Sequence, residues 1–282
     1  LASSAASDVY KRQTHYLPDE HGNSLSYHNV HALCMDGDDL WIGTYTGGVN
    51  VLNIKTGVFR VYTTKAGDPT TLDRSSSYAI FKDREARIWV TSMSGVNLYN
   101  REEDNFTRIR DLGSWIMDID QDADGNIWFS SQGNGLFKYD PDKQEWTNYV
   151  HSSAPGALIN DQVNCVLIDG NGEMWIGTMN GLCKYNAKED QFELIPLDIP
   201  SRNICAIIED QRVLWLTTTK GLVRYVPGES CQVFTRSDGL QSEQFLVNAA
   251  LKASDGKIYI GSVNGFNAFY PCLLYTSDAA DE

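Results

Sequence analysis

Short runs of alternating apolar and polar residues recur along this chain, separated by stretches rich in Gly, Asn and Asp. The runs QEWTNY at 144–149 and QFEL at 191–194 alternate with a period of two, which is typical of a strand with one buried face. A motif of an apolar residue, Trp, a second apolar residue and two small residues returns at intervals of 39 to 48 residues, with Tyr259 replacing the last Trp. Its six copies begin at Leu40, Ile88, Ile127, Met174, Leu214 and Ile258.

Each copy of the Trp motif lies inside a longer repeated unit. Upstream, apolar residues occupy positions 1 and 4 of a seven-residue element and Asp occupies position 7, as in Ile116, Ile119 and Asp122. A turn-rich stretch such as ADGN at 123–126 follows, and a Gly comes six or seven residues after each Trp. Asp and Asn bond their own backbone in turns and Gly supplies positive φ. Each unit therefore predicts a β-hairpin, a Gly turn, a third strand and, from the alternating run, a fourth.

Four short strands in every ~40–50 residues predict the blade of a β-propeller, so we expect an all-β fold. One blade cannot bury both faces of its sheet, and we therefore expect the Trp residues to pack between neighbouring blades. Period-two alternation disfavours a helical solenoid, and a β-helix would have rungs of about half this length. We expect five complete blades and a partial one, truncated from a seven-bladed ring. The expected blades span about 30–64, 77–110, 115–150, 163–195, 204–236 and, in part, 247–270.

The two ends of the chain differ from the repeats. The sequences SSAASDVYKRQ at 3–13 and CLLYTSDAADE at 272–282 resemble translations of one transposase-type sequencing adapter read on opposite strands. We therefore expect 1–13 and 272–282 to be non-native tails and 14–271 to be the partial propeller. The tails carry net charges of +1 and −3, so removing them changes the formal charge from −14 to −12.

Charge and hydropathy argue against two kinds of partner. A net charge of −14 argues against a nucleic-acid binder, which needs a basic face. No apolar run approaches the ~18 residues of a membrane-spanning helix, so we expect no membrane contact by this segment.

The repeat resembles that of a known family. The pattern Asp-x-x-Gly-x-Ile/Leu-Trp-x-Gly-Thr, followed by Gly-Leu-x-x-Tyr, is carried best by 122–139 and 169–185 and resembles the two-component regulator propeller repeat. The stretches DGLQSEQF at 238–245 and GSVNGFNAFYP at 261–271 resemble the last blade of the second propeller in hybrid two-component sensors. Ala86 in place of a turn Gly, and Tyr259 in place of Trp, depart from the pattern without threatening the fold.

The resemblance implies a sensory role. The resemblance implies that this chain belongs to a sensor that detects glycan fragments in the periplasm and switches on polysaccharide-utilisation genes. A Tyr-rich immunoglobulin-like domain, a membrane helix and a histidine kinase are implied to follow the propeller. The expected partners are an oligosaccharide ligand, the rest of the sensor chain and, at full length, a second copy in a homodimer. The segment itself is expected to be no enzyme and to bind no cofactor.

Candidate ligand-binding residues follow from propeller geometry. The innermost strands begin at one rim of the central channel, where ligands commonly dock. Amides and hydroxyls can bond sugar hydroxyls, and Trp or Tyr can stack on the apolar face of a sugar ring. Trp115 stands out because its sister positions are polar; the alternative is that these groups only satisfy strand ends and channel water. The candidates are His31, Tyr78, Trp115, Asn164, Asn203 and Asn248.

Two clusters of potential metal ligands occur, and we expect neither to bind metal. Asp120, Asp122 and Asp124 match the start of a calcium loop. Ser131 stands where that loop needs a bidentate Glu, and the last two carboxylates also fit a hairpin turn, which we prefer. A zinc site would need three or four ligands to converge from different elements. The residues concerned are His15, His21, His28 and His31, with Asp19 and Glu20 nearby.

Five cysteines remain once the tails are removed, and none forms a C-x-x-C motif. Several take strand positions that hold Ala or Val in sister units, so we expect small core residues. Cys165 and Cys205 lie in neighbouring units but differ by one register position, which places them on opposite strand faces. A disulfide between them is therefore not expected.

Three classes of function compete. A sensory binding module is favoured by the 238–271 stretch. A streptogramin-lyase-like enzyme would need a catalytic His with a metal-binding acid at the channel rim. A protein-interaction scaffold is the third, although the Gly-His and Trp-Asp signature of WD repeats is absent. No phosphate-binding Gly loop or Gly-x-Ser-x-Gly elbow occurs, whereas a carboxylate pair for glycosidic cleavage stays open because any two Asp can meet in space.

Overall fold

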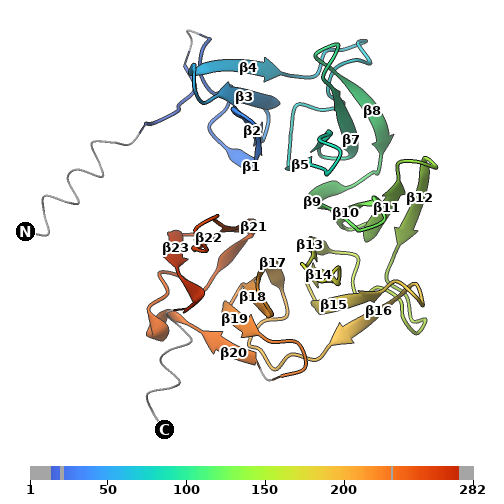
Figure 1. The fold of residues 1–282 in the computed structure, drawn as a ribbon, viewed down its shortest axis with the longest axis vertical. Coiled ribbons are helices and arrows are strands. Elements are labelled where there is room, and N and C mark those ends of the chain that lie inside the picture. Colours follow the sequence, from blue (N-terminus) through green and yellow to red (C-terminus); the bar gives the residue numbers. More distant parts are fainter. Residues whose placement is uncertain (1–13, 20–21, 230, 273–282) are drawn as a thin grey trace, which may run out of the picture.

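The computed structural model describes residues 14–19, 22–229 and 231–272, and these form a ring of six antiparallel sheets (Figure 1). Five sheets have four strands and the sixth has three, each ordered as the strands follow in the chain. One 3-10 turn, η1 (Arg236–Asp238), is the helical element among the described segments. The prediction of an all-β propeller is confirmed. The expected tails at 1–13 and 272–282 lie outside the described residues, apart from Cys272.

The strands of the six blades have the following bounds. Blades 1 and 2 comprise β1 (Val30–Asp36), β2 (Asp39–Thr44), β3 (Val49–Asn53), β4 (Val58–Tyr62), β5 (Ala79–Lys82), β6 (Ile88–Thr91), β7 (Gly95–Asn100) and β8 (Asn105–Asp111). Blades 3 and 4 comprise β9 (Trp115–Gln121), β10 (Ile127–Gln132), β11 (Leu136–Asp140), β12 (Glu145–Tyr149), β13 (Val163–Ile168), β14 (Met174–Thr178), β15 (Gly181–Asn186) and β16 (Gln191–Ile195). Blades 5 and 6 comprise β17 (Ile204–Asp210), β18 (Val213–Thr218), β19 (Gly221–Tyr225), β20 (Cys231–Phe234), β21 (Phe245–Lys252), β22 (Ile258–Ser262) and β23 (Gly265–Phe269).

The repeated hydroxyl and Gly residues form the turn between the second and third strands. In blade 3 the Ser131 hydroxyl donates to the carbonyl of Gly135 at 2.8 Å, and the equivalent bond occurs in all six blades. Gly135 has φ 76° and a Cβ there would collide with the Tyr149 carbonyl. Only Gly fits this position without strain, which is why the repeat retains it.

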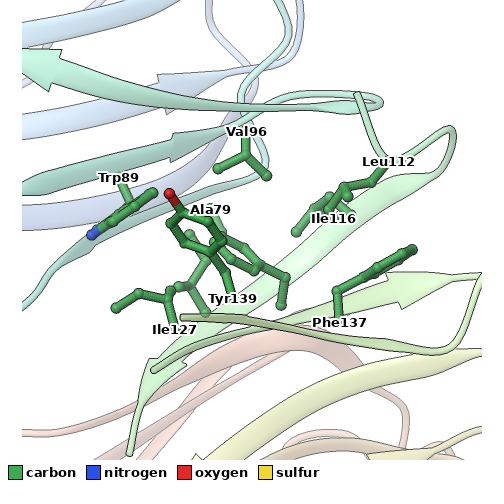
Figure 2. Packing of buried hydrophobic residues seen from close by; sticks show 10 residues of the cluster. Ala79, Trp89, Val96, Leu112, Ile116, Ile127, Phe137 and Tyr139 are labelled. Atoms are coloured by element: carbon green, nitrogen blue, oxygen red, sulfur yellow. The ribbon is translucent and has the colours of Figure 1, made fainter. Parts of the chain in front are cut away.

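The Trp residues pack between neighbouring blades, as the repeat predicts. Trp89 of blade 2 is 1% exposed and lies against Ile127, Phe129 and Tyr139 of blade 3 (Figure 2). Trp41, Trp128, Trp175 and Trp215 are equally buried, each toward the following blade. Truncating such a side chain to Ala typically costs about 3–5 kcal/mol of stability, so these contacts dominate the cohesion of the ring.

Hairpin length decides what happens to the indole N–H. In blades 2, 3 and 4 five residues separate the first two strands, and the Asp that opens the turn accepts from the Trp Nε1 at 2.8–2.9 Å. In blades 1 and 5 only two residues separate them. There Trp41 and Trp215 have no hydrogen-bond partner for Nε1 among the described residues.

The Asp of a short hairpin instead joins its blade to the next. Asp36 of blade 1 pairs with Lys82 at 2.8 Å and with Arg101 at 2.6 Å, both in blade 2. Asp210 of blade 5 pairs with Lys252 of blade 6 at 2.9 Å. The same repeated Asp therefore either stabilises the turn of its own blade or forms an ion pair with the next blade.

The two end blades expose apolar side chains that their sister blades bury. Leu33 in β1 is 64% exposed, whereas the equivalent Val166 in β13 is 4% exposed. Phe266 in β23 is 66% exposed, whereas the equivalent Leu222 in β19 is 1% exposed. Among the described residues, each end blade thus has one face without a neighbouring blade. The expectation of a truncated seven-bladed ring stays a prediction.

We predict that Asp122→Ala destabilises the propeller by roughly 1–3 kcal/mol. The substitution removes the acceptor for the Trp128 indole N–H and for the backbone N–H of Asp124 and Asn126, and a buried donor left unpaired costs about that much. Urea unfolding followed by Trp fluorescence measures the change. Asp142→Ala, which removes an exposed carboxylate in the β11–β12 hairpin of the same blade, is the control and should stay within about 0.5 kcal/mol. Equal effects of the two substitutions would contradict this role.

Candidate functional site

The inner strands β1, β5, β9, β13, β17 and β21 surround the centre of the ring, and each contacts the next (Figure 1). Because every blade runs antiparallel from its inner strand outward, all inner strands begin at the same end of the ring. The second strands end there, and the third strands begin there. Side chains close to these points therefore gather at one end of the channel, even when they come from different blades.

Four aromatic side chains from three blades form one continuous group at this end, which we call the aromatic platform: His31, Tyr45, Tyr78 and Trp115. The His31 ring lies 4.9 Å from Tyr78, edge to face, and 5.9 Å from Tyr45. Tyr78 stacks on Trp115 at 5.5 Å with 18° between the ring planes. Three of the six predicted residues thus come together, joined by Tyr45, which the sequence analysis missed because it follows a second strand.

The platform presents apolar faces and one unsatisfied hydroxyl. Trp115 is 41% exposed and Tyr45 is 38% exposed, whereas Tyr78 is 6% exposed. The Tyr78 hydroxyl is buried and has no hydrogen-bond partner among the described residues. A buried hydroxyl without a partner costs about 1–3 kcal/mol, so this oxygen favours a ligand or water that can bond to it.

The platform is uncharged near neutral pH. Burial lowers the pKa of His31 below its ordinary value of 6.5. Burial, and to a smaller extent Tyr45, raises the pKa of Tyr78 above 10. A neutral aromatic surface of this kind suits the apolar face of a sugar ring better than it suits an ion.

The three predicted Asn residues make contacts within the protein. Asn164 is 1% exposed, and its Nδ2 donates to Asn203 Oδ1 and to the Ile204 carbonyl, both at 2.8 Å, which joins blades 4 and 5. Asn248 lies in a bulge of β21 with φ 54°, and its Nδ2 donates across the channel to the Met117 carbonyl of blade 3 at 2.5 Å. Their part in ligand binding stays a prediction, but the amide groups of Asn164 and Asn248 already donate to partners within the protein.

Two partly buried Asp side chains lie on the inner strand of blade 3. Asp118 accepts from the Val166 N–H at 3.1 Å, and Asp120 accepts from the Ile168 N–H at 2.7 Å, so both hold β9 against β13. Burial raises the pKa of Asp118 to about 8 and that of Asp120 to about 6, despite these bonds.

Sequence reasoning missed this pair, although the repeat contains a signal. Aligning the repeats shows that the positions of Asp118 and Asp120 hold Cys165 and Leu167 in blade 4. In blade 5 the same positions hold Ala and Ile. Two acids at positions that are apolar in sister blades indicate a local role.

The potential metal ligands do not converge. Asp122 accepts from Asn126 and Trp128, whereas Asp120 faces Ile168 of the next blade and Asp124 lies at the exposed hairpin tip. Among the described residues no group of three His, Cys, Asp or Glu side chains could hold a metal ion. Of the His cluster, His21 and its neighbour Glu20 lie outside the described residues.

The described cysteines are all free thiols, and Cys165 and Cys205 form no disulfide. Burial raises the pKa of both thiols, to about 11 for Cys205. Both lie in the core of inner strands, which agrees with the expectation of small core residues. Nothing in this setting activates them as nucleophiles.

The enzyme hypothesis required His31 to lie beside a carboxylate at the rim. The ring contacts that His31 makes are with Tyr45 and Tyr78, and within the described part of the chain no carboxylate pairs with it. This arrangement counts against a lyase-like catalytic centre. No helix among the described residues is long and apolar enough to cross a membrane.

Comparison with known proteins identifies the repeat. Residues 24–46 and 157–180 match the family described as two component regulator propeller, which confirms the predicted resemblance. The chain is 28% identical to histidine kinase P4 of Formosa agariphila over 314 aligned positions, covering 88% of this chain. It spans only 22% of that relative's length.

Solved structures share the fold. The extracellular domain of the hybrid two component system BT3049 of Bacteroides thetaiotaomicron matches with a TM-score of 0.76 and 23% identity, covering 90% of this chain and 35% of that one. An inactive variant of virginiamycin B lyase of Staphylococcus aureus matches with a TM-score of 0.65 and 11% identity, covering 90% and 87%. At these identities the likeness concerns the fold, and a sensor and a lyase share it.

We predict that Asp118 makes the stability of the propeller fall as pH rises from about 4 to about 8. In that window the folded chain, with a pKa of about 8, retains a proton that the unfolded chain releases near its ordinary value of 3.8. Protonation therefore favours the folded state, with a slope of at most about 1.4 kcal/mol per pH unit. Urea unfolding at several pH values measures the slope.

Asp118→Asn should flatten this profile between about pH 6 and pH 8, because the amide oxygen can still accept from Val166 N–H but the charge is gone. Below about pH 6 the raised pKa of Asp120 keeps part of the slope. Asp142→Asn, an exposed carboxylate on a hairpin, is the control and should keep the parental slope. A profile unchanged by Asp118→Asn would show that this carboxylate does not titrate in the window.

Proposed function

We propose that this chain is the ligand-sensing propeller of a two-component sensor histidine kinase and that its aromatic platform binds a glycan fragment. The observation that carries the proposal is the convergence of His31, Tyr45, Tyr78 and Trp115 at one end of the channel. Support for the kinase comes from the matched repeats and from the histidine kinase relative. Because the chain spans about a fifth of that relative, the kinase remains part of the proposal.

The geometry of the platform suggests how a sugar would bind. The exposed indole of Trp115 offers a flat apolar surface for one face of a pyranose ring. Tyr78 stacks on Trp115 and is itself buried, so it holds the indole in place instead of meeting the sugar. Stacking on Trp115 then supplies the contact area, a role typical of aromatic side chains in small-molecule sites.

The remaining features of the proposal follow from the sensor assignment. The propeller would lie outside the cytoplasm, in the periplasm, and full-length chains would pair as homodimers. Ligand binding would shift the sensor between two rigid arrangements, which requires different affinities of the ligand for the two. The output would be the expression of polysaccharide-utilisation genes.

We also propose that a further blade completes the ring in the full protein. The exposed Leu33 and Phe266 lie at positions that every inner blade buries against a neighbour. A seventh blade between blades 6 and 1 would cover both faces and remove two open apolar surfaces.

Trp115→Ala is expected to weaken oligosaccharide binding about tenfold or more, since truncating a central aromatic contact typically costs roughly 2 kcal/mol. Calorimetry of the 282-residue chain against a panel of neutral and acidic oligosaccharides measures affinity. Trp115→Phe should retain part of the affinity because a ring remains. Phe266→Ala, which removes an exposed ring in blade 6, away from the platform, is the control and should bind normally. Sugar binding that survives Trp115→Ala would overturn the platform as the site.

The sensor assignment has its own test in the gene beyond Pro271. We expect an open reading frame that encodes a Tyr-rich β domain, one membrane helix and a histidine kinase. A stop codon soon after Pro271 in the native gene would refute the kinase connection and leave a scaffold or an enzyme as alternatives. The lyase alternative would also require a carboxylate paired with His31, whose ring contacts are with Tyr45 and Tyr78.

A further inference from the structure

A recess in blade 2 lies at the same end of the ring as the aromatic platform. It has a volume of about 470 Å³ and is lined chiefly by Arg74, Arg108, Arg110, Asp73 and Asp111. The lining contains three guanidinium groups and two carboxylates, although the formal charge of the protein is −14. The charged residues of the recess therefore sum to a positive charge, whereas the molecule as a whole is negative.

The recess adjoins the aromatic platform. Arg74 precedes Tyr78 by four residues, and Asp111 precedes Trp115 by four residues. Four residues span at most about 14 Å, so each side of the recess is tied to a platform residue within that distance. β7 begins and β8 ends at the recess, with Gly95 paired to Asp111, which places it at the end of the ring where β5 and β9 begin. One oligosaccharide could reach both.

The two carboxylates of the recess are already engaged. Asp73 accepts from the Ser92 hydroxyl at 2.8 Å and from Asn97 Nδ2 at 2.6 Å. Asp111 accepts from the Gly113 N–H at 2.8 Å. Neither forms an ion pair with an arginine of the recess among the described residues.

The arginines differ in how much of their charge is available. Arg108 donates to the carbonyls of Asp68, Thr71 and Leu72, so it holds the loop that forms one wall. The Arg110 guanidinium lies 5.3 Å from the centre of the Trp146 ring, which fixes its position without neutralising it. Arg74 is exposed and has no ion-pair partner in the described part of the chain.

We infer that this recess binds an anionic substituent of the glycan whose sugar ring stacks on Trp115, so that the ligand is an acidic oligosaccharide bearing a carboxylate or a sulfate. The inference rests on the proposed function and adds the substrate class. Arginine is suited to this task, because its planar fork can donate two parallel hydrogen bonds to either oxyanion and it remains charged at all relevant pH values. Arg74 and Arg110 are the recognition residues, and Arg108 positions the loop.

The test compares three probes that share a sugar backbone: trigalacturonate, galactotriose and a sulfated galactotriose. Calorimetry at low salt should give an affinity for at least one acidic probe about tenfold or more above that for galactotriose. The stronger of the two acidic probes identifies the source of the anion as carboxylate or sulfate. Raising the salt concentration should reduce this preference, because exposed ion pairs are screened.

The paired variant Arg74→Gln/Arg110→Gln should lower acidic-probe affinity to that of galactotriose and leave galactotriose binding unchanged. Arg74→Gln alone replaces an exposed side chain that has no ion-pair partner in the described part of the chain, so it should lose part of the preference and serves if the double variant unfolds. Arg212→Gln removes an exposed positive charge in the β17–β18 hairpin, at the opposite end of the ring, and is the control.

The outcomes separate the two proposals. Equal affinity for acidic and neutral probes, with Trp115→Ala abolishing both, would overturn the anionic subsite and retain the glycan platform. An acidic preference that Arg212→Gln reduces as much as Arg74→Gln would also overturn it, since net charge alone would then be responsible. Binding that ignores Trp115 but requires Arg74 would overturn the platform and retain an anion site. Absence of binding by all three probes would contradict both for this sugar class.

Discussion

Packing between consecutive blades is the interaction on which the structure depends. A four-stranded sheet has two apolar faces and can cover neither by itself, so each blade is stable only against its neighbours. The Trp of the second strand supplies the largest part of this contact, and it faces the following blade in blades 1 to 5. The Gly turns and the hydroxyl bonds that close them bring the third strand back into register beside this Trp. The exposed Leu33 and Phe266 show where that packing is missing.

Polar groups adjust to this framework blade by blade. The same repeated Asp accepts from an indole in a five-residue hairpin and forms an ion pair with the next blade in a two-residue hairpin. The outer strands carry a second kind of joint, in which Asp190 of blade 4 accepts from Tyr149 of blade 3 at 2.6 Å and from Tyr185 at 2.5 Å. Such bonds across blades are individually modest, and they add to the apolar contacts between neighbouring sheets.

The candidate site is a consequence of strand direction. Because all inner strands begin at one end, residues 14 to 84 positions apart, such as His31, Tyr45, Tyr78 and Trp115, meet without any loop reaching across. The recess in blade 2 lies at this end for the same reason, since the loop that precedes β5, the start of β7 and the end of β8 form its walls. A propeller thus collects side chains of different chemistry at one end while its packing is preserved elsewhere.

The sequence by itself determined the all-β propeller, the blade repeat and the rim on which the aromatic residues gather, because spacing and periodicity report local geometry and contacts between consecutive units. It pointed to His31, Tyr78 and Trp115, whose rings come together at that rim, although their part in binding stays a prediction. It did not point to Tyr45, which lies outside the inner-strand pattern. Only the tertiary structure decided what the amides do, since Asn248 bonds to Met117, 131 residues away across the channel. The tertiary structure also decided that Asp118 and Asp120 pack against β13. Their hydrogen-bond partners and their desolvation depend on which surfaces meet when the blades assemble. A repeat pattern does not encode these contacts between blades.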